Sequence, residues 1–160
     1  MDALGTIANR ERLRLTTARL VAIRSSEKVL SNTWWPVATD GGKNVDKILA
    51  LWLNSSLGLL SLIASRVDTE GAWVELKKPT LEELLVIDST KLSDDAQKKL
   101  GAAYDELSKM EIQTLSQMTI DEVREKIDAA ITNVLELADN LSLLRKLLAA
   151  EPIISMTLPA

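Results

Sequence analysis

Paired arginines near the start of the chain are the side chains best suited to chemistry with a charged ligand. Arg12 and Arg14 alternate with Leu13 and Leu15, and a strand places every second side chain on the same face. The two guanidiniums would then form a row suited to phosphate oxygens or to the edges of guanine bases. The alternative is the ordinary solvent face of a half-buried strand, which has the same pattern.

Further basic and aromatic residues extend this candidate surface. The candidate nucleic-acid-binding residues are Arg10, Arg12, Arg14, Arg19, Trp34, Trp35, Lys77 and Lys78. Neighbouring side chains of an extended chain point to opposite faces, so we expect one of Trp34 and Trp35 to be buried and the other to be exposed. An exposed indole can stack on a base. Trp52 and Trp73 lie in apolar stretches of sequence, which favours places in the core.

The chain lacks the residue types on which most hydrolases and zinc enzymes depend. Its 160 residues include no Cys and no His. This excludes thiol nucleophiles, disulfides, zinc sites built on thiolate or imidazole, and a Ser-His-Asp triad. The adjacent glycines Gly41 and Gly42 match neither the dinucleotide-binding nor the P-loop pattern, so Asp40–Lys43 is interpreted as an ordinary loop.

Acidic residues in the last third of the chain offer one further kind of site. Asp121, Glu125 and Asp128 fall on one helical face, where their carboxylates could hold a divalent cation. Arg124 and Lys126 interleave with them, so we interpret this face as solvated. The sequence predicts no metal site and no cofactor site in this chain.

The charge of the chain is unevenly distributed. The formal net charge is −4, yet residues 1–48 hold eight basic and five acidic residues. An acidic protein is not attracted as a whole to nucleic acid or to an anionic membrane, so a polyanion-binding surface is expected in the first third. No apolar stretch reaches the roughly 20 residues of a membrane span. We expect a cytoplasmic protein with no membrane partner.

Hydrophobic periodicity predicts an α+β fold with a small β-rich body, a buried helical segment and a helical C-terminal appendage. Extended segments are expected within residues 12–37, at 72–76 and at 85–87. The pattern over 45–64 predicts one long helix or two helices broken near 54–58. Apolar residues cover so much of its circumference that we expect it to be buried on more than one side.

Capping signals place the remaining helices. Thr80 and Thr119 are each followed three residues later by Glu, the pattern of a capping box, and Ser93 is a further helix cap. Another helix is expected from 141 to 150, ended by Pro152.

Several segments together resemble the C-terminal part of bacterial N6-adenine DNA methyltransferases. The resemblance is carried by Ser31–Val37, Ala50–Gly58, Gly71–Val74, Lys77–Pro79, Leu85–Asp88 and Asp121–Ala130. Their order is similar to half of a target-recognition domain, with strands, a helix ending in Leu-x-Asn-Ser, a glycine-containing turn and a further strand. The resemblance covers roughly residues 12–150.

The parts that catalyse methyl transfer in that family have no counterpart in this sequence. The family's enzymes hold the flipped adenine with an Asn/Asp-Pro-Pro-aromatic motif and hold S-adenosylmethionine with a glycine-containing loop. This chain has no Pro-Pro dipeptide and no such loop. The resemblance therefore implies the recognition end of a methyltransferase without its catalytic domain, which is not an enzyme on its own and has no cofactor of its own.

These expectations combine into a non-catalytic DNA target-recognition module. Residues 1–90 would form the DNA-facing α+β body and residues 91–160 a helical support. Basic strand residues would contact phosphates and one or two base edges of double-stranded DNA, weakly when the module is alone. The module would position DNA for a separate S-adenosylmethionine-dependent catalytic domain, in the same chain or in another, that flips the adenine.

Two other functions fit the same sequence. The net charge of −7 after residue 48 would suit a protein-interaction module with no direct DNA contact. An apolar helix at 45–64, exposed where a missing domain would dock, would favour the same function. A small enzyme that uses carboxylates and Arg is the other alternative, and no motif supports it.

Overall fold

Short strands occupy the first part of the chain and helices dominate the rest, in the predicted α+β arrangement. The computed structural model describes residues 7–27, 34–37, 39, 43–66, 73–138 and 141–155. In chain order the elements are β1 (Ile7–Arg10), β2 (Arg12–Arg14), β3 (Ala22–Arg24), β4 (Trp34–Val37), α1 (Lys43–Asn54), α2 (Ser56–Ala64), β5 (Trp73–Glu75), α3 (Lys78–Glu82), the 3₁₀ helix η1 (Ser89–Lys91), α4 (Asp94–Leu107), the 3₁₀ helix η2 (Leu115–Gln117), α5 (Glu122–Val134), α6 (Ser142–Ala150) and α7 (Pro152–Ser155). The loop predicted at Asp40–Lys43 lies outside the described residues as far as Gly42, and Lys43 begins α1.

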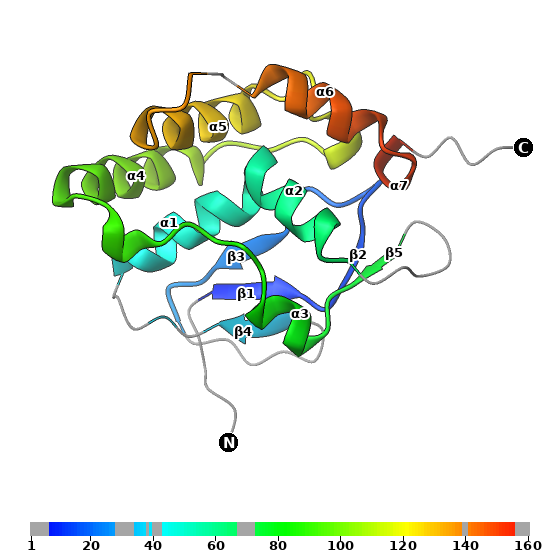
Figure 1. The fold of residues 1–160 in the computed structure, drawn as a ribbon, viewed down its shortest axis with the longest axis horizontal. Helices are drawn as coiled ribbons and strands as arrows, with labels where there is room; N and C mark the ends of the chain where they lie inside the picture. Colours follow the sequence, from blue (N-terminus) through cyan, green and yellow to red (C-terminus); the bar gives the residue numbers. More distant parts are fainter. Residues whose placement is uncertain are drawn as a thin grey trace, which may run out of the picture.

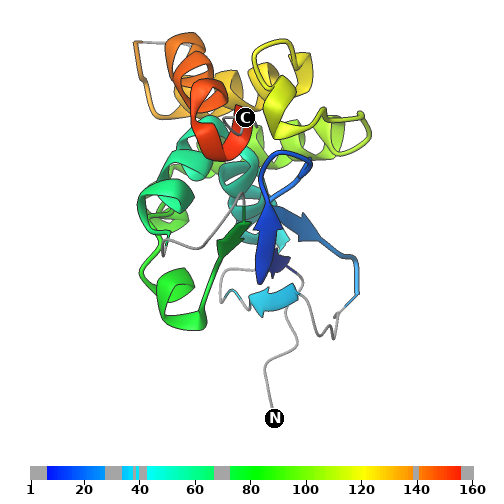
Figure 2. The ribbon, with the colours of Figure 1, turned by 90° about the vertical axis from the view of Figure 1, so that its right-hand side faces the viewer.

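Three layers are stacked in the molecule (Figure 1, Figure 2). The strands and α3 lie lowest in both views, α1 and α2 cross above them, and α4, α5 and α6 lie on top. The middle layer therefore has neighbours on two sides. This position explains why apolar residues cover so much of the circumference of α1 and α2.

The strands form two small antiparallel sheets. The first has the order β3-β1-β4, and the second is a ribbon of β2 and β5. Only Glu11 separates β1 from β2, so the chain passes directly from one sheet into the other. These strands confirm the extended segments expected before residue 40 and near 72–76.

Residues 85–87, predicted as a strand, belong to no strand in the described part of the chain. The carbonyl oxygen of Leu85 instead accepts hydrogen bonds from Trp52 Nε1 at 3.1 Å and from Ser61 Oγ at 3.0 Å. Side chains of α1 and α2 thus take the place that a neighbouring strand would occupy.

Two clusters of buried apolar side chains hold the layers together. The first lies among the strands, α2, α6 and α7 and includes Ile7, Leu13, Leu59, Val74 and Ile154. The second joins α1 to α4 and α5 and includes Ile48, Leu51, Leu100, Ile127 and Ile131. The apolar segment 45–64 is therefore covered mainly by this chain itself. The expectation that it lies exposed for a missing domain is wrong.

The segment 45–64 forms two helices, with a bend of 71° between α1 and α2. Asn54 at the end of α1 stabilises the bend: its Oδ1 accepts from Val21 N at 2.8 Å, and its Nδ2 donates to the carbonyl oxygens of Ala22 and Ala50, each at 2.8 Å. Ser55 then caps α2 by accepting from Gly58 N. In the described part of the chain no single helix is long and apolar enough to cross a membrane, although α1 and α2 taken together reach that length and composition.

Helix starts follow the local sequence in one case and depart from it in two. Ser93 caps α4 as predicted, with its Oγ accepting from Ala96 N at 3.2 Å. Neither predicted capping box forms. Thr80 lies inside α3, which begins earlier because Pro79 is well suited to a first helical turn. Asp121 takes the place of Thr119 as the cap of α5, since its carboxylate accepts from Val123 N in the first turn of the helix.

Candidate nucleic-acid interface

The ribbon of β2 and β5 brings Arg12 and Arg14 onto one exposed face, as predicted. The cross-strand pairs are Arg12 with Glu75, Leu13 with Val74 and Arg14 with Trp73. Leu13 and Val74 are fully buried, whereas Arg12, Arg14 and Trp73 are exposed. The two strands lie side by side at the centre of Figure 2, on a side of the molecule that the helices leave open.

Hydrogen bonds and buried leucines next to the ribbon fix which of its faces points outward. Leu76 N donates to the carbonyl oxygen of Glu11 at 2.8 Å, which extends the pairing by one residue beyond β5. After β2 the chain turns, with Ala18 N donating to Arg14 O at 2.9 Å. Leu15 and Leu76 are both fully buried at the ends of the two strands. A slip of one residue would expose these leucines, so the register is strongly specified.

The charge of Arg12 on the outward face is only loosely engaged within the protein. Arg12 Nη2 lies 3.9 Å from Glu75 Oε1, and the Arg12 side chain is 69% exposed. An exposed ion pair of this kind stabilises by about 0–1 kcal/mol. A phosphate group can therefore compete for the Arg12 guanidinium at little cost.

Trp73 belongs to this face and not to the core, where it was expected. The Trp73 side chain is 48% exposed. It lies two residues from Glu75 on the same face of β5 and opposite Arg14, whereas Val74 between Trp73 and Glu75 points inward. The ribbon thus presents a large aromatic ring beside two guanidiniums.

Lys77 and Lys78 continue the basic surface immediately after β5. Both side chains are exposed. Lys78 lies 3.9 Å from Glu82 one helical turn later, and both side chains of that pair are well exposed. Two further predicted basic residues are therefore exposed directly after the strand that pairs with the ribbon arginines.

Three of the predicted residues, Arg19, Trp34 and Trp35, do not join this face. Arg19 donates to Glu111 and to the carbonyl oxygen of Ile112, which ties the chain before β3 to the segment after α4. The side chain of Arg10 lies outside the described residues. Trp34 and Trp35 lie on β4 in the other sheet, and both are partly buried. The expectation of one buried and one exposed indole is wrong because β4 is an edge strand whose two faces are each partly covered.

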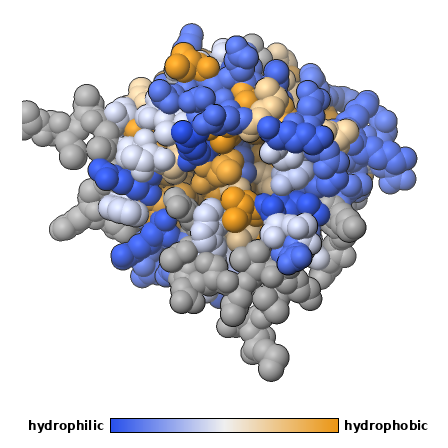
Figure 3. Space-filling model, turned by 180° about the vertical axis from the view of Figure 1, so that it is seen from behind, coloured by the Kyte–Doolittle hydropathy of each residue, from blue (hydrophilic) through white to orange (hydrophobic). Residues whose placement is uncertain are grey.

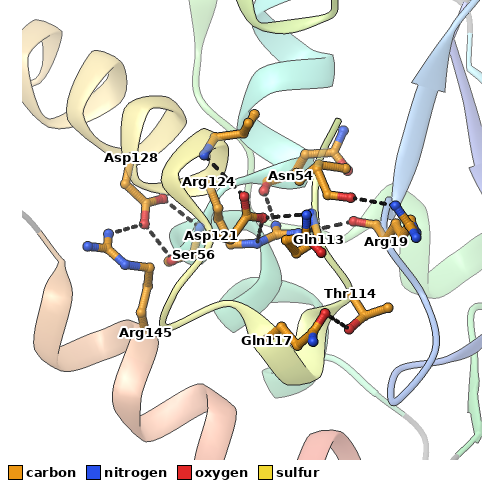
Figure 4. Close-up of polar contacts among 12 residues, drawn as sticks. Arg19, Asn54, Ser56, Gln113, Thr114, Gln117, Asp121, Arg124, Asp128 and Arg145 are labelled. Carbon is orange, nitrogen blue, oxygen red and sulfur yellow. Dashed lines mark hydrogen bonds and ion pairs between the residues drawn. The ribbon is translucent and has the colours of Figure 1, made fainter. Parts of the chain in front are cut away.

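A buried polar network that the sequence did not predict joins the bend between α1 and α2 to α5 and α6 (Figure 4). Asp128 accepts hydrogen bonds from Ser56 N at 2.8 Å, from Ser56 Oγ at 2.6 Å and from Arg145 Nη1 at 2.7 Å. Asp128 is fully buried and Arg145 is 5% exposed. These contacts anchor the start of α2 to both upper helices.

Arg124 forms the second half of the network. Its Nη1 donates to the carbonyl oxygen of Asn54 at 2.6 Å and its Nη2 to that of Arg19 at 3.0 Å. Burial lowers the pKa of Arg124, and the negative charges of Asp121 and Asp128 oppose that shift. The guanidinium is thus a cross-link between α5, the end of α1 and the chain before β3.

The network corrects the prediction of a solvated acidic face on α5. Glu125 is exposed, but Asp121 is 3% exposed and Asp128 is fully buried. The signal in the sequence is the position of Arg124 and Asp128, four residues apart and next to the apolar stripe of the helix. Among the described residues, no group of three or more acidic side chains is placed to hold a metal ion.

Comparisons of the chain with protein-family models, with curated proteins and with solved structures find no match.

Proposed function

We propose that this chain is a non-catalytic DNA target-recognition module whose contact surface is the outward face of the β2–β5 ribbon. The observation that carries the proposal is the placement of Arg12, Arg14 and Trp73 on one exposed face. Lys77 and Lys78 follow directly. A two-stranded ribbon is narrow enough for the major groove of double-stranded DNA, where guanidiniums bind guanine edges and phosphates.

The charge balance of the module favours weak DNA binding by the isolated chain. The whole protein carries a net charge of −4, so attraction to DNA depends on a few ribbon side chains. Tight and specific recognition then requires further contacts from a partner. In this proposal the partner is an S-adenosylmethionine-dependent adenine methyltransferase domain, in cis or in trans, and the complex acts in the cytoplasm.

The upper helices support the ribbon without contacting DNA in this proposal. Arg124 and Arg145 are buried in the polar network, so these two cations of the helical part are not offered to a ligand. The buried network supports this division, because it ties α5 and α6 rigidly to the layer above the strands.

A protein-interaction module is the second candidate, and one observation favours it. Leu143 and Leu147 lie one turn apart on α6 and are 61% and 60% exposed. Exposed apolar pairs of this kind are typical of contact surfaces. This function would leave the ribbon arginines without a role in binding.

Fluorescence anisotropy with labelled double-stranded DNA tests the first proposal against the second. The double variant Arg12→Ala/Arg14→Ala should bind DNA about thirtyfold more weakly than the native chain, since each of the two lost phosphate or base contacts costs on the order of 1 kcal/mol. The matched control Lys98→Ala/Lys99→Ala removes the same charge from exposed positions on α4 and should retain the native affinity. Equal losses in the two variants would contradict a contact surface on the ribbon.

A further inference from the structure

A cavity of about 240 Å³ lies among β3, α1, the end of α4 and α5. β3 and the segment after α4 lie on the side of the molecule seen in Figure 3, where hydrophobic residues gather at the centre between hydrophilic margins. Most of the lining is apolar and includes Leu20, Ile23, Leu51, Leu107, Met110 and Ile112. The DNA-binding proposal makes no use of this cavity.

One cation is built into the lining. Arg24 is the single charged residue among the residues that line the cavity, and no acidic residue accompanies it there. Its Nε atom is buried and has no hydrogen-bond partner in the part of the chain that the structure describes. A buried donor without an acceptor costs on the order of 1–3 kcal/mol, which an incoming acceptor would recover.

Among the residues that line the cavity, the polar side chain that hydrogen-bonds with Arg24 is the neutral Tyr104, so no carboxylate of the lining accepts from the guanidinium. The amide of Asn54 is occupied by hydrogen bonds to Val21, Ala22 and Ala50. Burial raises the pKa of Tyr104, against the opposing effect of the neighbouring Arg24 charge, so the phenol is protonated at neutral pH and can donate. The cavity therefore combines an apolar wall with a guanidinium and a hydroxyl, and no carboxylate is among the residues that line it.

We propose that this cavity binds a small apolar monocarboxylate, with its carboxylate on Arg24 and Tyr104 and its hydrocarbon body among the leucine and isoleucine side chains. A planar carboxylate matches the fork of a guanidinium. The volume of about 240 Å³ corresponds to on the order of eight non-hydrogen atoms, at roughly 30 Å³ for each water-sized group. A substituted benzoate or a medium-chain acid has this size.

A matched pair of probes tests the proposal: 4-methylbenzoate, and the neutral 4-methylbenzamide of the same shape. Both are titrated into protein with ¹³C-labelled Ile, Leu and Met methyl groups and followed by NMR. We expect saturable shifts at Ile23, Met110 and Ile112 with 4-methylbenzoate, with a dissociation constant on the order of 1 mM. The amide should bind about tenfold more weakly because it lacks the charge-assisted contact. The methyl groups of Ile154, in the other apolar cluster, should not shift.

Two variants separate the contribution of the Arg24 charge from that of the cavity volume. Arg24→Gln should weaken the binding of 4-methylbenzoate by about tenfold and leave the affinity for 4-methylbenzamide unchanged, so that the protein binds the two probes equally well. Ser108→Phe, at an exposed position of the lining, should block both probes without disturbing the core. The surface variant Lys126→Gln controls for the loss of one positive charge.

Three results would overturn the proposal. These are equal affinities of the two probes for the native protein, an acid preference that persists in Arg24→Gln, and shifts that do not centre on the lining methyl groups. None of these results concerns the β2–β5 ribbon, so the DNA-binding proposal is tested independently of this one.

Discussion

At the scale of single residues, burial separates side chains that look alike in the sequence. Arg12 and Arg124 are both flanked by apolar and charged neighbours, yet Arg12 is exposed on the ribbon and Arg124 is fully buried. The exposure of Arg12 could be predicted because strand alternation is a local property. The burial of Arg124 could not, because it depends on carbonyl groups of Asn54 and Arg19 that are distant in the chain.

Replacement of Asp128 should be strongly destabilising. Asp128→Ala removes the buried carboxylate that Arg145 Nη1 contacts and the two oxygen atoms that accept from Ser56. Breaking a buried ion pair in this way costs about 3–5 kcal/mol, which urea unfolding followed by circular dichroism would measure. The control Glu125→Ala removes an exposed carboxylate 3.4 Å from the same Arg145 and should cost less than about 1 kcal/mol. Similar losses in the two variants would contradict the role assigned to the network.

Tyr104 gives a direct titration signal, because it is the only tyrosine in the chain. Burial raises its pKa above the ordinary value of 10.0, and the Arg24 charge opposes this shift. The midpoint of the rise in near-ultraviolet absorbance from the phenolate should therefore lie above pH 10.0, and Arg24→Gln should move this midpoint to higher pH still. A transition that moves to lower pH in the variant would show that Arg24 does not act on Tyr104.

The same shift sets the sign of one pH effect on stability. The folded state holds the phenolic proton of Tyr104 more tightly than the unfolded state does. The contribution of this group to the free energy of unfolding is therefore fully present below pH 10.0 and is lost as the pH rises through the folded-state pKa. Far-ultraviolet circular dichroism over the same range would separate titration of the folded protein from unfolding.

At the scale of elements, local signals were reliable where no tertiary contact competes with them. Ser93 begins α4 as its position in the sequence predicts. Thr119 does not begin α5, because Asp121 also accepts from Gln113 N at 3.2 Å and so serves the loop and the helix together. The apolar residues 85–87 have the sequence pattern of a strand. The carbonyl group of Leu85, however, accepts from side chains of α1 and α2, and these contacts cannot be predicted from the local sequence.

The close approach of α1 and α2 depends on Gly58. A Cβ atom added there would lie 2.0 Å from the carbonyl oxygen of Trp52 and 2.8 Å from its carbonyl carbon, both of them backbone atoms. Gly58→Ala should therefore destabilise the protein by about 3 kcal/mol or more, since the bend must open to admit the methyl group. Thermal unfolding is the measurement.

Gly101 in α4 is the matched control for Gly58, because it is also helical and buried. Its added Cβ would meet only side chains, the nearest being Asn44 Oδ1 at 3.2 Å. Alanine also favours the helix by about 1 kcal/mol over glycine. Gly101→Ala should therefore change the stability by less than about 1 kcal/mol. Equal effects at the two glycines would show that the bend is not sterically fixed.

At the scale of the whole molecule, the layers separate a basic edge from an acidic helical part. The strands β2 and β5 belong to the lowest layer (Figure 1), and the buried network ties the upper helices to the middle layer (Figure 4). The layering could be predicted in outline, because the apolar circumference of the segment 45–64 required cover on two sides. The polar contacts of Ser56, Asp128 and Arg145 between these layers could not be predicted, because polar side chains at such positions are usually exposed on the surface.

The dependence of DNA affinity on salt tests the central claim most directly. If Arg12, Arg14, Lys77 and Lys78 contact phosphates, the logarithm of the association constant should fall with the logarithm of salt concentration at a slope of about −3 to −4. Replacing Arg12 and Arg14 together by Ala should flatten the slope by about two units, and the Lys98→Ala/Lys99→Ala control should keep the native slope. Binding that does not depend on salt, or a ribbon variant with the native slope, would contradict DNA recognition by the ribbon.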